Sequence, residues 1–106
     1  MAKVFKKTLT VRGIEENARR FRDSLKQARY VLDGETVNMN FLKVLLEGDT
    51  VKIYLYFDDG VVGNITNVEV LDIEDGVIIS TDDSFSKSEH KGFYILFKYQ
   101  FVEGEI

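Results

Sequence analysis

The sequence predicts an α+β domain, with a strand and two helices in its first half and an antiparallel β meander in its second. Apolar residues recur at helical spacing through residues 14–30. Residues 51–102 are instead rich in β-branched and aromatic residues, and polar Asp- and Gly-containing segments interrupt them. A chain of 106 residues is long enough for one domain with a modest core.

The first predicted element is a strand over residues 2–12. Leu9 and Val11 point to one face, because side chains alternate along a strand. The polar side chains point to the other face: Thr8, Thr10 and Arg12. Gly13 is expected to end the strand.

Two helices are predicted to follow. The first, over residues 14–30, carries acidic side chains in its first turn and basic ones near its end, as the helix dipole favours. Asp33 and Gly34 would stop it, since glycine accepts the left-handed conformation at a helix end. Thr36 is the expected N-cap of a second, more apolar helix over residues 37–47.

This order of elements resembles the ribbon-helix-helix family of DNA-binding proteins, over about residues 6–48. The resemblance is carried by the strand TLTVR and by the spacing of Gly34, Thr36 and Asn38 in GETVNMN. It implies a homodimer in which one strand from each copy forms a ribbon that enters the major groove of double-stranded DNA. The alternative is that these are the first elements of an ordinary α+β domain.

The resemblance assigns DNA-binding roles to two groups of residues. On the strand these are Lys6, Thr8, Thr10 and Arg12, and Arg12 is the best candidate for contact with guanine. At the start of the second helix the backbone N–H groups of three residues would hold a phosphate: Thr36, Val37 and Asn38. Glu35 departs from the pattern, because its carboxylate would repel that phosphate.

The second half is predicted to form a four-stranded meander or small barrel. The expected strands are 51–57, 61–72, 76–81 and 92–102. Hairpins are expected at the two Asp-Gly pairs that end at Gly60 and Gly76, and the longest loop is 82–91. Gly63 indicates a bulge or bend. The pattern is distantly similar to the Gly-marked strands of Sm-like and SH3-like barrels.

The two expected units, 1–48 and 49–106, should pack as one compact domain, and charge is distributed unevenly along the chain. Residues 1–30 hold nine Lys or Arg and three Asp or Glu, whereas residues 31–106 hold five and fifteen. The basic segment favours a polyanionic partner, and the acidic half favours a protein partner. The absence of cysteine and of a long apolar segment predicts a cytoplasmic protein that does not cross a membrane.

Few residues have the chemistry of catalysis. His90 is the one histidine, and the Asp58-Asp59 pair beside a glycine is typical of a turn. We therefore expect no enzyme activity, no metal and no cofactor. The function predicted is that of a dimeric DNA-binding transcriptional regulator of phage or mobile-element type. The alternative is an acidic α+β module that binds another protein, as an inhibitor or a nucleic-acid mimic.

Overall fold

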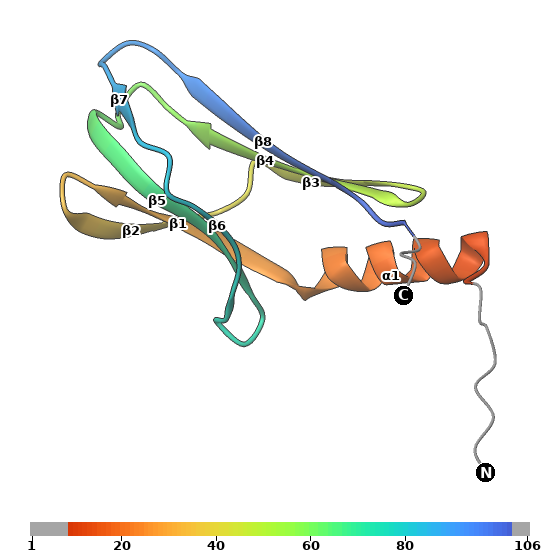
Figure 1. Cartoon of the computed structure of the whole chain (residues 1–106). Coiled ribbons are helices and arrows are strands. Elements are labelled where there is room, and N and C mark those ends of the chain that lie inside the picture. Colours follow the sequence, from red (N-terminus) through yellow and green to blue (C-terminus); the bar gives the residue numbers. More distant parts are fainter. Residues whose placement is uncertain (1–8, 103–106) are drawn as a thin grey trace.

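The computed structural model describes residues 9–102 and is mostly β, with one helix and two packed sheets (Figure 1). The elements in order are α1 (Val11–Ser24), β1 (Leu25–Leu32), β2 (Glu35–Met39), β3 (Lys43–Glu47), β4 (Thr50–Phe57), β5 (Gly63–Asp72), β6 (Val77–Thr81), β7 (Phe85–Lys87) and β8 (Phe93–Gln100). β1, β2, β5, β6 and β7 form a five-stranded sheet, and β3, β4 and β8 form a three-stranded sheet.

α1 begins at a capped N-terminus. The Oγ1 of Thr10 accepts a hydrogen bond from Gly13 N–H at 3.1 Å, which satisfies one of the helix's free donors. Its apolar side presents Ala18, which is fully buried, and Phe21. The helix ends at Ser24, whose hydroxyl donates to the carbonyl of Phe21 at 2.7 Å. The chain passes directly from this last turn into β1.

In each sheet a two-residue hairpin joins an edge strand to its neighbour. Asp33 and Gly34, with φ of 49° and 89°, connect β1 to β2, and two positive φ angles are what a type I′ turn requires. β3 and β4 are joined through Gly48, with φ of 60° at the first turn position. The segment between β2 and β3 carries the chain from one sheet to the other.

Long-range pairings complete both sheets. β5 pairs antiparallel with β1 on one side and with β6 and β7 on the other. β8 pairs with β4 along its whole length, from Thr50 opposite Gln100 to Phe57 opposite Phe93. The order in the three-stranded sheet is therefore β3-β4-β8, and β4 is its central strand.

The core lies between the inner faces of the two sheets. The rings of Tyr30 on β1 and Phe57 on β4 pack edge to face, with centroids 5.0 Å apart. Beyond the start of β1 the five-stranded sheet ends, and α1 continues in its place beneath the three-stranded sheet (Figure 1). There Phe21 packs against Tyr99 and Phe101, with centroids at 5.9 and 5.4 Å.

The predicted strand-helix-helix start is wrong. Residues 2–8 of the predicted first strand lie outside the described residues, and its last residues belong to α1. The helix expected over 14–30 ends at Ser24, and 25–30 belong to β1. The helix expected over 37–47 is instead parts of β2 and β3, in different sheets.

Tertiary pairing explains why the segment after Ser24 is extended. Ala28 and Tyr30 are buried at alternate positions of β1, and each strand edge is occupied by a neighbour, β2 or β5. Arg29 lies opposite Glu69 on β5, and their side chains form an ion pair at 2.8 Å. These contacts outweigh the modest helical propensity of LKQARYVL.

The predicted meander is also wrong in its connections. The expected strands 51–57, 61–72, 76–81 and 92–102 largely coincide with β4, β5, β6 and β8. The hairpin between β5 and β6 at Gly76 is confirmed. The hairpin expected at Gly60 does not form, because β4 and β5 belong to different sheets. The expected loop 82–91 contains β7.

Candidate interaction surface

The residues predicted to read DNA from a strand do not lie on one. Lys6 and Thr8 are outside the described residues. Thr10 is the N-cap of α1, and Arg12 is an exposed residue of the first helical turn. A ribbon formed by two copies of this segment would need extended backbone where α1 begins.

The predicted phosphate clamp is a β strand. Thr36, Val37 and Asn38 lie within β2, opposite residues of β1, so no helix N-terminus is present to direct their N–H groups at an anion. Val37 is half-buried against the core, whereas its two neighbours are exposed. β2 and the start of α1 lie toward opposite ends of the molecule (Figure 1), so the two predicted groups do not come together.

The outer edge of β8 is the most prominent candidate for an interaction. Within residues 9–102, β8 pairs with β4 along one edge, and the other edge of β8 is unpaired. Phe101 N–H donates to the carbonyl of Asp49 (2.9 Å), just before β4, so every second residue before Phe101 forms its backbone hydrogen bonds with β4. In an antiparallel pair only every second residue directs its N–H and C=O groups at a given neighbouring strand. The backbone groups of Tyr94, Leu96 and Lys98 therefore face away from β4.

Apolar side chains flank this edge on both faces of the sheet. Phe93 is 41% exposed, Tyr94 64% and Leu96 49%. Proteins usually protect an edge strand with charges, proline or a bulge, yet Lys98 is the one charged residue of β8 and its register with β4 is unbroken. β8 therefore has the features of a strand that pairs with another.

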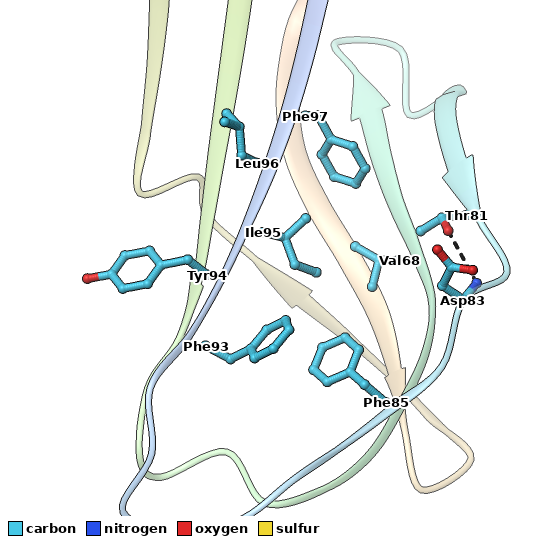
Figure 2. A pocket seen from close by; sticks show the side chains of 9 residues that line it. All are labelled: Val68, Thr81, Asp83, Phe85, Phe93, Tyr94, Ile95, Leu96 and Phe97. Atoms are coloured by element: carbon cyan, nitrogen blue, oxygen red, sulfur yellow. Dashed lines mark hydrogen bonds between the residues drawn. The ribbon is translucent and has the colours of Figure 1, made fainter.

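A cleft of about 370 Å³ opens beside β8, on the inner side of its sheet. Figure 2 shows the rings of Phe85 and Phe93 next to each other in its lining, while Tyr94 points to the opposite side of the sheet. The Phe85 and Phe93 centroids are 4.4 Å apart with planes at 24°. The remaining lining comes from β5, from the end of β6 and the segment after it, and from β8: Val68, Thr81, Asp83, Tyr94, Ile95, Leu96 and Phe97.

The outer face of the three-stranded sheet combines tyrosines with lysines. The rings of Tyr56 and Tyr94 lie 4.6 Å apart on neighbouring strands, and the Nζ of Lys43 lies 4.7 Å from the Tyr54 ring. Lys52 and Lys98 are directly opposite each other, an arrangement of like charges that is unfavourable by itself.

One carboxylate partly balances these lysines. Glu47 accepts from Lys52 at 3.2 Å across the β3–β4 hairpin. No hydrogen bond or ion pair of Lys98 is found within residues 9–102. The outer face of this sheet thus carries surplus positive charge in an otherwise acidic half of the chain.

The polar residues considered for catalysis, Asp58 and His90, lie in turns and loops. The Oδ1 of Asp58 accepts from Gly60 N–H at 2.9 Å, which is the turn role expected from the sequence. His90 is exposed and its Nε2 lies 3.6 Å from Glu89. Among the described residues no three metal-ligating side chains come together, and no helix there has the length and apolarity to span a membrane.

The chain matches no family model, no curated protein and no solved structure. Its candidate surface therefore rests on its own geometry. Sequence reasoning located the strand that forms β8 but missed its edge position. The available signal was the continuous apolar run FYILF, which indicates contacts on both faces.

Proposed function

We propose that this chain is a protein-binding module that adds an extended strand of its partner to the free edge of β8. The observation that carries the proposal is an unbroken edge strand with outward backbone groups and exposed apolar side chains. Strand addition uses these features together, because main-chain hydrogen bonds supply affinity and alternate side chains supply specificity.

The two faces of β8 define the chemistry of the partner strand. On the inner face its side chains would enter the cleft beside Phe85 and Phe93, so they should be apolar. On the outer face they would lie next to Lys98, where a carboxylate or an aromatic ring is favourable. Each added backbone hydrogen bond contributes about 0.5–1.5 kcal/mol net.

This proposal develops the protein-binding alternative from the sequence. The DNA-binding prediction depended on a strand over residues 2–12 and on a second helix over 37–47. α1 begins at Val11, and β2 and β3 occupy most of the second range. The exposed arginines of α1 remain, but the helix also carries three acidic residues. β8 offers a mechanism that needs no rearrangement.

Selection of random decapeptides, followed by amide hydrogen exchange, tests the proposal. At a concentration where the protein is monomeric, a selected peptide should protect the amides of Tyr94, Leu96 and Lys98. Those of Ile95 and Phe97 should already be protected by β4. Selected peptides that leave all three outward amides unprotected would contradict strand addition.

Proline variants provide a matched control for that experiment. Leu96→Pro removes an N–H that faces the free edge, so peptide binding should be lost while the fold persists. Ile95→Pro removes an N–H directed at β4 and should destabilise the protein itself. Undiminished peptide binding by the Leu96→Pro variant would contradict the proposed mode.

The outer face supports a second candidate function, binding of single-stranded nucleic acid. Tyrosine rings on an open sheet can stack with bases, and the facing Lys52 and Lys98 would contact phosphates. Tyr94→Ala should then lower the affinity for a labelled oligothymidine, measured by fluorescence anisotropy, by roughly tenfold or more, since stacking contributes ~1–3 kcal/mol per base. Val77→Ala, on the five-stranded sheet, should leave affinity unchanged.

A further inference from the structure

We infer that the strand accepted by β8 is β8 of a second copy of this chain, antiparallel, about a two-fold axis at Leu96. The inference rests on the proposed function, since it names the partner of the same edge. The resulting dimer would have one continuous sheet, with three strands from each copy. Residues 93–99 of the two copies would pair.

The pleat restricts where the axis can lie. Tyr94, Leu96 and Lys98 point to the outer face, and opposite residues of an antiparallel pair share a face. An outward residue must therefore meet an outward residue, which places the axis at a residue and not between two. The backbone groups of Leu96 face the free edge, so two copies of Leu96 can exchange both hydrogen bonds.

Charge disfavours the axes at Phe97 and Lys98, and an axis at Ile95 would pair only residues 93–97 of β8. With the axis at Leu96, each Lys98 lies opposite Tyr94 of the other copy, and the two lysines are separated by four positions, about 14 Å. With the axis at Phe97, the two lysines become diagonal neighbours at about 7–8 Å. An axis at Lys98 would oppose them directly. The Leu96 axis avoids both repulsions and allows a cation–π contact.

The same register is apolar on the inner face. Phe97 meets Ile95 of the other copy, and Phe93 meets Tyr99. The incoming aromatic side chains lie at the mouth of the cleft beside Phe85, where Phe93 is 41% exposed. Aromatic and β-branched cross-strand pairs each contribute about 0.2–1 kcal/mol beyond alanine.

The ends of the joined strands are complementary in charge. Pairing brings the Gln100 end of each β8 near the Phe93 end of the other. α1, with its exposed arginines, packs beneath the first end, and Asp83 lines the cleft at the second. Each α1, which carries four arginines and three acidic residues and so a net charge of +1, would thus lie on the same side of the joined sheet as the acidic segment after β6 of the other copy.

Cysteine cross-linking tests the axis directly, because the chain has no cysteine of its own. Oxidation of Leu96→Cys should give a covalent dimer in high yield, since opposite Cα atoms of a hydrogen-bonded pair are about 5.5 Å apart. Gln100→Cys is the matched control. Its two copies would be eight positions apart, about 27 Å, and should not cross-link.

Sedimentation of the reduced proteins supplies the second measurement. The unmodified chain should form a dimer, and Leu96→Glu should be a folded monomer that still unfolds cooperatively, because the side chain at this position is half exposed. A chain that remains monomeric at millimolar concentration overturns the inference. Preferential cross-linking through Gln100→Cys overturns the register.

The outcome separates this inference from the proposed function. A monomer whose selected peptides protect Tyr94, Leu96 and Lys98 retains the strand-accepting edge and excludes self-pairing. A dimer in which those three amides exchange rapidly excludes β8 as the interface and overturns this inference. The proposed function is contradicted as well only if selected peptides also leave the three amides unprotected.

Discussion

The ring of Phe85 stacks on the ring of Phe93 at a centroid distance of 4.4 Å, and this contact joins β7 of one sheet to β8 of the other. Phe85 also packs edge to face with Phe57 at 5.8 Å. The two sheets are therefore held together by aromatic contacts beside the free edge that we propose as the binding surface.

Replacing Phe85 by alanine should lower the free energy of unfolding by about 2–4 kcal/mol. The estimate lies somewhat below the usual cost of truncating a buried phenylalanine, because Phe85 is only half-buried. Urea denaturation gives the value. Val77→Ala, at an exposed position of β6, is the control and should change stability by less than about 0.5 kcal/mol.

Replacement by alanine should lower the stability of the fold at Gly63 and raise it at Gly13. Gly63 has a φ of 134°, and a Cβ there would overlap the carboxylate of Asp33, which accepts from Asn64 N–H. Gly63→Ala should destabilise by about 1–3 kcal/mol. Gly13 is helical with room for a methyl group, so Gly13→Ala should stabilise by about 0.5–1 kcal/mol. Equal effects in thermal melts would contradict this distinction.

Thr10 should behave as a helix cap. Thr10→Ala removes the acceptor of the Gly13 N–H and should cost about 1 kcal/mol, whereas Thr10→Ser should retain most of the stability. Chemical denaturation followed by circular dichroism measures both. If the serine variant loses as much as the alanine variant, the cap is not the source of the effect.

Asp49 should titrate below the ordinary aspartate value of 3.8. Hydrogen bonds from Gln100 and then Thr50 lower the pKa of its carboxyl, because both stabilise the charged form. A lowered folded-state pKa contributes stability above the unfolded value, and that contribution is lost as pH falls through the folded value. Carbon-detected NMR titration measures the pKa.

The control for this titration is Gln100→Ala. Removing the amide that donates at 3.2 Å should raise the Asp49 pKa toward its ordinary value. An unchanged titration curve would assign the shift to other groups. Because Asp49 is only half-buried at the surface, the associated change in stability should be small.

The sequence was informative where local chemistry determines structure. β-branched and aromatic runs located β4, β5, β6 and β8, and the Asp-Gly pair at Gly76 marked a real hairpin. It failed between residues 25 and 47, where short apolar segments fit both helix and strand. The Asp33-Gly34 pair was read as a helix stop, although the same dipeptide is a strong hairpin signal.

Pairing between distant strands could not be derived from periodicity. Nothing local in β4 indicates that it pairs with β8 and not with β5, since all three are apolar strands bounded by polar turns. The candidate site could not be predicted for the same reason, because it depends on β8 being at an edge. The functional prediction relied on the polar face of a strand predicted over residues 2–12, whereas the candidate surface at β8 is aromatic.

The ladder between β4 and β8 also has a consequence for how the chain acquires its structure. It joins Thr50 to Gln100, 50 residues further along the chain, so the three-stranded sheet cannot be completed until synthesis has passed Gln100. Closing so long a segment slows folding, and meanwhile the edge of β4 is open. During that interval β8 of a neighbouring chain can pair with this edge of β4 in place of β8 of the same chain. Exchange of this strand between nascent copies is therefore the misassembly to which this topology is most exposed.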